Sequence, residues 1–121
     1  MSTNSNIAMK KEDESIISIY CHWDGYPSNQ MPILENYYNT KDKVEELISL
    51  GNLSYLEKSC KCPEGHTFEK PIDGYCLAYG QDRGEDHQEP QLFYSESDWL
   101  FRNSQQYNYL FENNEWKCIK R

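Results

Sequence analysis

The sequence of 121 residues contains no apolar run that approaches the about 20 residues of a membrane-spanning helix. Its first 15 residues are polar and lack the apolar core of a secretory signal. The 12 basic residues are scattered and are outnumbered by 20 acidic ones, which gives a net charge of -8. The summed field of this charge would repel a phosphate backbone. We therefore expect a cytoplasmic protein that binds neither membranes nor nucleic acid directly.

Apolar residues are also scarce, at 37% of the chain, and the mean hydropathy is -0.94. Ten Tyr and three Trp compensate for this scarcity, because their rings bury large apolar surfaces while a polar tip stays solvated. Such an aromatic content is not typical of disordered chains. The length fits one domain, which we place at residues 15–121 after a flexible, polar segment of residues 1–14. The five cysteines, an odd count, are expected to be reduced thiols.

Apolar periodicity predicts the secondary structure of the domain. Residues 16–23 alternate as a strand, with Ile17, Ile19 and Cys21 on one face and Ser18, Tyr20 and His22 on the other. Further elements are a short helix after Pro32, a helix from Thr40 to a left-handed Gly51, a buried strand at 75–79, a helix near 97–102 capped by Ser95 or Ser97, and a hairpin of 107–112 and 115–119 across Asn113-Asn114. Residues 57–73 and 81–90 are expected to be loops. These elements predict an α+β fold, with an antiparallel sheet of four to five strands and two or three short helices packed on one face.

Several ordered motifs resemble a family of small proteins encoded by bacteriophages, prophages and mobile elements. They are Tyr20-Cys21-His22-Trp23-Asp24-Gly25-Tyr26-Pro27, Leu34-Glu35-Asn36-Tyr37-Tyr38, residues 43–54, Gly65-His66-Thr67-Phe68, residues 78–85 and residues 109–116. The resemblance covers residues 16–119, and Cys60-Lys61-Cys62 departs from it. It implies phage ancestry, host-cell cytoplasm as the location and, because small accessory phage proteins commonly act on the host, the binding of a host or defence component.

Zinc is one candidate for the chemistry of the chain. Cys60, Cys62 and His66 could supply three ligands from one loop, and Cys21 or Cys76 would have to complete a tetrahedral site. The chain lacks the paired Cys-x-x-Cys signature of structural zinc sites. The alternative is that Cys21 and Cys76 are small buried strand residues and that the loop thiols are free. We therefore predict no cofactor, with a zinc-stabilised structural protein as the alternative.

Catalytic signatures are missing from the sequence. No nucleophile elbow, phosphate-binding loop or zinc-protease motif occurs. Cys21 and His22 do not form a dyad, because neighbouring side chains in a strand point to opposite faces. We predict a protein that is not an enzyme and has no catalytic residue.

A small-molecule pocket is a further hypothesis. His22, Asp24 and Tyr26 lie at the end of one strand, and Arg83 and Glu85 follow another. If these strands are neighbours, Arg83 would offer a planar donor fork to a phosphate or carboxylate of a nucleotide-derived signal, and Trp23 or Tyr26 a stacking face. The structural alternative is that Asp24 caps its own turn and that Arg83 pairs with Asp24 or Glu85.

The last hypothesis is a protein-binding surface. Residues 82–98 hold six acidic side chains and one arginine, and aromatic residues lie beside them. Such a surface suits a basic partner. The predicted contact residues are Asp82, Glu85, Asp86, Glu89, Tyr94 and Trp99. The alternative is a solvated loop followed by a helix whose aromatic side chains face the core.

The resemblance, the acidity and the missing catalytic signature together favour one function. We expect a non-enzymatic accessory protein of phage type that binds and inhibits a host or anti-phage defence component. Sequestration of a nucleotide-derived small molecule is the second hypothesis, and a zinc-stabilised structural protein is the third. No feature of the sequence indicates an oligomeric state.

Overall fold

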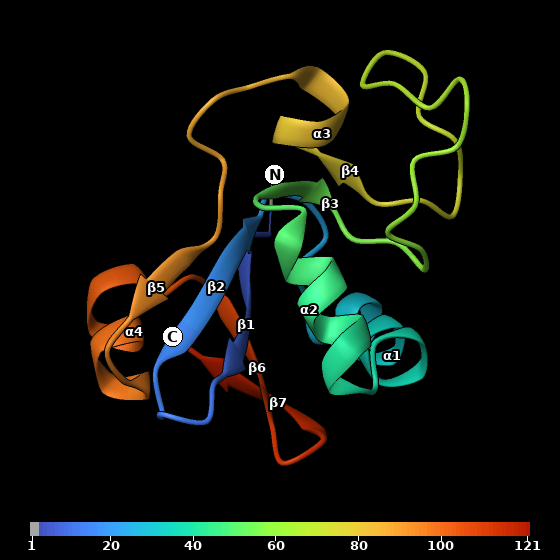
Figure 1. Cartoon of the computed structure of the whole chain (residues 1–121). Helices are drawn as coiled ribbons and strands as arrows, with labels where there is room; N and C mark the ends of the chain where they lie inside the picture. Colours follow the sequence, from blue (N-terminus) through green and yellow to red (C-terminus); the bar gives the residue numbers. More distant parts are fainter. Residues whose placement is uncertain (1–2) are drawn as a thin grey trace.

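Seven β-strands form one mixed sheet in the computed structural model, which describes residues 3–121 (Figure 1). The strands are β1 (Ser5–Lys10), β2 (Ile16–Cys21), β3 (Leu53–Tyr55), β4 (Leu77–Ala78), β5 (Gln91–Phe93), β6 (Tyr107–Glu112) and β7 (Glu115–Lys120). The helices are α1 (Pro27–Tyr37), α2 (Lys41–Ser49), α3 (Tyr79–Arg83) and α4 (Glu96–Asn103). The strand order is β4-β3-β2-β1-β6-β7, and β5 pairs separately with β2.

The strand β1 occupies the middle of the sheet, which corrects the prediction of a flexible segment over residues 1–14 for residues 5–10; residues 1 and 2 of that segment lie outside the described part of the chain. Ile7 lies opposite Ile19 of β2 and opposite Tyr109 of β6, and it is fully buried. The polar composition of β1 is misleading because its polar side chains have buried partners. Ser5 donates to Gln30 Oε1 at 2.8 Å, and Asn6 donates to an amide oxygen of β6. Buried polar groups are tolerated when such hydrogen bonds are made.

The prediction of an antiparallel sheet of four to five strands is also wrong in two respects. The sheet has seven strands, and two of its pairs are parallel, β1 with β6 and β2 with β3. Both parallel pairs join strands that are separated along the chain by helices. Parallel neighbours require such crossover connections, so local hydrophobic patterns do not reveal them.

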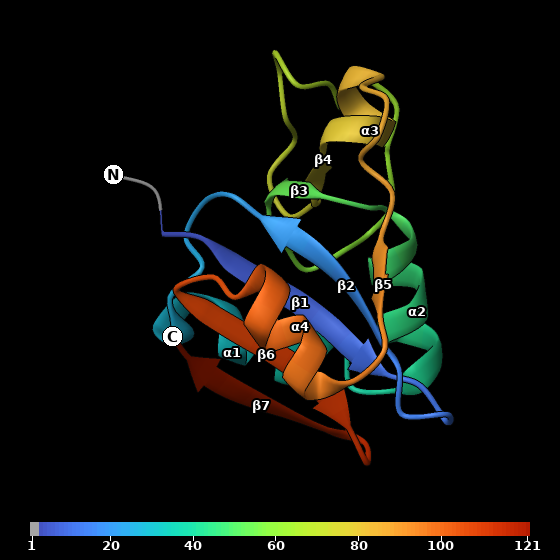
Figure 2. The same cartoon turned by 90° about the vertical axis from the view of Figure 1, so that its left-hand side faces the viewer.

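Helices cover both faces of the sheet rather than one, as the two views show (Figures 1 and 2). On one face, α1 and α2 bury Leu34, Val44 and Leu47 in the larger apolar core. On the other face, α4 buries Trp99 in a second, smaller core. The helices α1 and α2 on one face and α4 on the other form two layers, because successive strand residues point to opposite faces and β1 and β2 carry apolar side chains on both.

The predicted helix after Thr40 is confirmed as α2. The Thr40 hydroxyl accepts a hydrogen bond from the Lys43 amide at 3.3 Å, as an N-cap residue does. Gly51 follows the helix with φ of 78°, and a Cβ atom there would lie 2.2 Å from the Gln88 carbonyl oxygen. Glycine is therefore required at this position by both the backbone conformation and the close approach of the 88–89 segment.

Other predicted elements are confirmed with altered bounds. The helix α1 begins at Pro27 rather than after Pro32, and a short helix, α3, occupies the start of the predicted 81–90 loop. The cap of α4 is Ser95, which accepts from the Asp98 amide at 3.1 Å. In the C-terminal hairpin, Asn113 and Asn114 both have positive φ, as tight hairpin turns demand.

Replacement of Ile7 tests whether β1 is central. We expect Ile7→Ala to lower the free energy of unfolding by about 2–5 kcal/mol, because it leaves a cavity in the larger core, between the sheet and the helices α1 and α2. The matched control is Lys11→Ala, at an exposed position directly after the strand, which should change stability by at most about 0.5 kcal/mol. Urea denaturation followed by tryptophan fluorescence measures both. Equal stabilities of the two variants would contradict the central position of β1.

Candidate functional site

A cluster of buried polar groups lies beneath the irregular segment of residues 56–76, where α3 meets β4. The Asp82 carboxylate accepts from the Ala78 amide at 2.8 Å and from the Cys62 thiol at 3.3 Å. It also lies 3.8 Å from His66 Nε2, and both side chains are fully buried. Asp82 therefore holds the irregular segment to the start of α3.

Both ring nitrogens of His66 are engaged by the backbone of the same segment. Nδ1 accepts from the Ile72 amide at 2.9 Å, and Nε2 lies 3.1 Å from the Cys76 carbonyl oxygen. This pattern fits the neutral tautomer that carries its proton on Nε2. In this tautomer both ring nitrogens of His66 are hydrogen-bonded to the loop backbone, so neither offers a free lone pair to a metal.

The thiols of Cys60 and Cys76 both lie beside the Tyr38 hydroxyl. Cys76 Sγ lies 3.5 Å and Cys60 Sγ 3.6 Å from the Tyr38 hydroxyl oxygen. The Glu57 amide also donates to Cys76 Sγ, at 3.2 Å. Tyr38 belongs to the motif of residues 34–38 in the sequence, but no role at a site was predicted for it. Its position one helical turn after the buried Leu34 indicates that it faces the core.

The predicted zinc ligands are therefore distributed over different partners. Cys60 contacts Tyr38, Cys62 contacts Asp82, and Cys21 lies apart, with its sulfur 3.2 Å from the Gln30 amide nitrogen. Residues 3–121 contain no group of three or more His, Cys, Asp or Glu side chains arranged to hold a metal ion. The zinc hypothesis stays a prediction that metal analysis of the protein must test.

Cys21 and His22 point to opposite faces of β2, as predicted. Burial raises the pKa of the Cys21 thiol to about 12, which disfavours its thiolate form at neutral pH. His22 lies on the other face, where its Nδ1 is 2.8 Å from the Tyr20 hydroxyl.

The predicted ligand-binding residues at the end of β2 serve the turn into α1. Asp24 adopts a left-handed φ of 57°, and its carbonyl oxygen accepts from Asn29. Gly25 lies against β1, where a Cβ atom would be 2.8 Å from Ser5 Cβ. Tyr26 is the N-cap residue and Pro27 the first residue of α1, a position that proline favours.

Arg83 and Glu85 pair with each other instead of joining that turn. Arg83 Nε lies 3.4 Å from Glu85 Oε2, and the guanidinium lies 5.1 Å from the centre of the Phe68 ring. No ion pair within residues 3–121 links Arg83 to Asp24. The structure thus brings Arg83 to Glu85 and leaves His22, Asp24 and Tyr26 in a separate group.

Hollows in the surface lie away from the Asp24 turn. One of about 390 Å³ is lined by Met9, Lys10, Lys41 and the 113–114 turn. Two of its cations are paired within it, Lys10 with Glu112 at 2.7 Å and Lys41 with Glu12 at 3.5 Å. A second, of about 410 Å³, includes Glu85 and Glu89. Neither hollow is lined by His22, Asp24 or Arg83.

The predicted protein-binding residues divide into buried and exposed members. Trp99 is fully buried and its indole donates to the Ser18 hydroxyl at 3.0 Å, so its proposed role as a surface anchor is wrong. The Asp82 carboxylate is buried in the cluster above. Asp86 and Glu89 are exposed, and Tyr94 is 87% exposed. Phe101, on the outer face of α4, is 92% exposed.

Comparisons of the chain with protein-family models, with curated proteins and with solved structures find no match. The resemblance to phage proteins therefore remains a prediction from the motifs. Within residues 3–121, no helix has the length and apolarity needed to cross a bilayer.

The Asp82 contacts predict a large stability effect. We expect Asp82→Ala to reduce the free energy of unfolding by about 1–3 kcal/mol, because it leaves the buried Ala78 amide without its acceptor. Asp86→Ala removes the same charge from an exposed position nearby and should stay within about 0.5 kcal/mol of the wild type. Urea unfolding measures both variants, and an unaltered midpoint for Asp82→Ala would contradict the anchoring role of Asp82.

Proposed function

We propose that the protein is a non-enzymatic binding protein that attaches to a basic surface of a host or anti-phage defence protein and inhibits it. The observation that carries this proposal is the exposure of two large aromatic side chains, Tyr94 at 87% and Phe101 at 92%. Large exposed aromatic residues are costly to leave in water, and aromatic residues often anchor a protein partner.

These two residues belong to one side of the molecule. Tyr94 follows β5 directly and Phe101 lies on α4, and in Figure 2 both elements face the viewer. Leu92 of β5 is 60% exposed as well, but it pairs with Ile17 and therefore lies on the sheet face that α1 and α2 cover. We name the set Asp86, Glu89, Tyr94 and Phe101 the acidic–aromatic surface.

The charge of this side determines the kind of partner that fits. Asp86 and Glu89 are exposed, and neither takes part in an ion pair of the described residues 3–121. The chain as a whole carries a net charge of -8. Free carboxylates beside apolar anchors favour a partner with lysine or arginine around an apolar patch, and the overall charge speeds the encounter with it.

Inhibition of a host or defence component rests on the motif resemblance. Small phage proteins of this kind commonly act by occupying a surface that the target needs. The target we propose has a positively charged working surface, such as a channel that holds nucleic acid, which the acidic–aromatic surface would cover.

A capture experiment with paired variants tests the binding surface. The immobilised protein is incubated with bacterial lysate, and retained proteins are identified by mass spectrometry. We expect Tyr94→Ala/Phe101→Ala to reduce retention of the specific partner at least about tenfold, because two anchor side chains are removed. At low salt, Asp86→Lys/Glu89→Lys should also reduce retention of the partner relative to the wild type. Retention by the wild type should fall as the salt concentration rises.

Matched controls lie on the opposite side of the sheet. Tyr37→Ala removes a half-exposed tyrosine of α1, and Glu35→Lys reverses an exposed charge on the same helix. Both controls should retain the partner as the wild type does. The proposal would be contradicted if the test and control variants lost partner retention equally, or if the retained protein had no basic surface.

A plaque assay tests inhibition. Expression of the wild-type protein in cells that carry the captured defence component should restore phage plating, and the Tyr94→Ala/Phe101→Ala variant should not. Binding without restored plating would overturn the inhibitory role and leave the binding surface supported.

A further inference from the structure

Cys60 and Cys76 lie next to each other because of a short parallel pairing in the irregular segment. Ser59 and Tyr75 form a parallel bridge, in which the Ser59 amide donates to the Gly74 carbonyl and the Cys76 amide donates to the Ser59 carbonyl at 2.9 Å. Cys60 and Cys76 are the next residues in this register, so their side chains leave the backbone on the same side. Neighbouring strands are about 4.8 Å apart, and this separation lies within the Cα range of a disulfide.

The two thiols share one hydrogen-bond partner, the Tyr38 hydroxyl. Both sulfurs contact the Tyr38 hydroxyl, at 3.5 and 3.6 Å, and Cys76 also lies 3.4 Å from the Glu57 carbonyl oxygen. Cys76 is fully buried, whereas Cys60 is 7% exposed. The hydrogen bond from Cys60 lowers the pKa of Cys76, and donation by the Glu57 amide supports the same direction. Cys76 is thus the thiol that ionises first, and Cys60 is placed to attack the sulfur of Cys76 once that sulfur is oxidised.

We propose that Cys60 and Cys76 are an oxidation site at which a hydroperoxide closes a disulfide across residues 61–75. The site is independent of the acidic–aromatic surface. It uses two thiols that both contact the Tyr38 hydroxyl, which distinguishes them from Cys62, whose partner is Asp82.

The chemistry requires one equivalent of peroxide. The Cys76 thiolate attacks a peroxide oxygen, the O–O bond breaks, and the departing hydroxide takes a proton to form water. Cys60 then loses its proton and attacks the sulfur of the resulting sulfenic acid. The S–O bond breaks, the S–S bond forms, and the second hydroxide leaves as water after protonation. Two thiols lose two electrons in total, and the peroxide is reduced to two waters.

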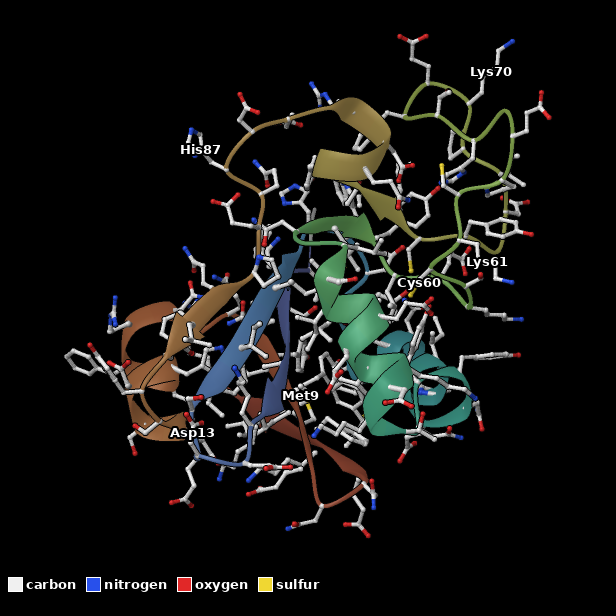
Figure 3. The ribbon with its side chains drawn as sticks, viewed as in Figure 1. Met9, Asp13, Cys60, Lys61, Lys70 and His87 are labelled. Carbon is white, nitrogen blue, oxygen red and sulfur yellow. The ribbon has the colours of Figure 1, made fainter. Side chains whose placement is uncertain are left out.

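Access to the pair depends on the segment that covers it. Residues 61–75 contain no helix or strand, and they contact the rest of the molecule through His66 on the Cys76 carbonyl, Cys62 on Asp82 and the Phe68 ring on Tyr79. Figure 3 shows Cys60 at the inner end of this segment, while Lys61 and Lys70 point away from the molecule. Local opening of such a segment costs less free energy than global unfolding, and it would admit a small peroxide. The disulfide would then restrict the opening and raise the melting temperature.

Native oxidation followed by peptide mapping tests the proposal. The wild-type protein is treated with a small excess of hydrogen peroxide, free thiols are alkylated, and the product is digested without reduction. Trypsin together with glutamyl endopeptidase, which cuts after Glu64 and Glu69, separates Cys62 from Cys76. We expect a loss of about two mass units and a linked peptide pair that contains Cys60 and Cys76. Cleavage after Lys61 alone should leave two fragments that separate only on reduction.

The remaining cysteines supply the controls. Cys62→Ser and Cys118→Ser should form the same linked pair at the wild-type rate, and Cys60→Ser should abolish it. The wild-type mapping needs no variant to fold, so the result stands even if Cys60→Ser is unstable. Links that involve Cys62 at equal yield, or a Cys60–Cys76 yield no greater than that in urea-unfolded protein, would overturn the proposal.

Discussion

The pairing of β1 with both β2 and β6 is the constraint on which the structure depends. It joins the N-terminal strand to the C-terminal hairpin, with Ser5 beside both Cys21 and Tyr107. Without β1, β2 and β6 would each expose an unpaired edge, and neither apolar core would close. The two cores use alternate residues of this one strand, Ile7 and Met9 in one and Ala8 in the other. A short polar segment therefore holds the whole domain together.

The motif that begins at Tyr20 forms a turn that packs against β1 and β6. Gly25 allows the chain to pass close to β1, and its amide donates to the Thr3 carbonyl at 2.8 Å. Its carbonyl accepts from the buried Tyr109 hydroxyl of β6. Asp24 and Pro27 shape the turn on either side of it. The turn thus fastens the start of α1 to β1 and β6.

The acidic–aromatic surface and the thiol pair occupy different parts of the molecule. The surface belongs to α4 and to the segments on either side of β5, and α4 is held there by the buried Trp99. The thiols lie on the other side of β3 and β4, under the irregular segment and against α1 through Tyr38. Each is supported by its own core. A change at one site therefore need not disturb the other.

Local patterns were sufficient for the elements whose signals lie within a few residues. Thr40 and Gly51 bound α2, Ser95 caps α4, and Asn113-Asn114 turns the last hairpin, because caps and turns are set by short-range hydrogen bonds and backbone conformation. The alternation in β2 likewise predicted that Cys21 and His22 would separate. The sequence alone therefore determined most of the elements and the acidic character of the protein.

Tertiary structure decided where those elements meet. The partners of Asn6 lie about a hundred residues away along the chain, so its polar segment could not be recognised as a central strand from its neighbours. The same long-range packing buried Trp99, left Phe101 in solvent and set Cys60 beside Cys76. A residue type states what a side chain is able to do, but only the folded chain decides which groups it faces.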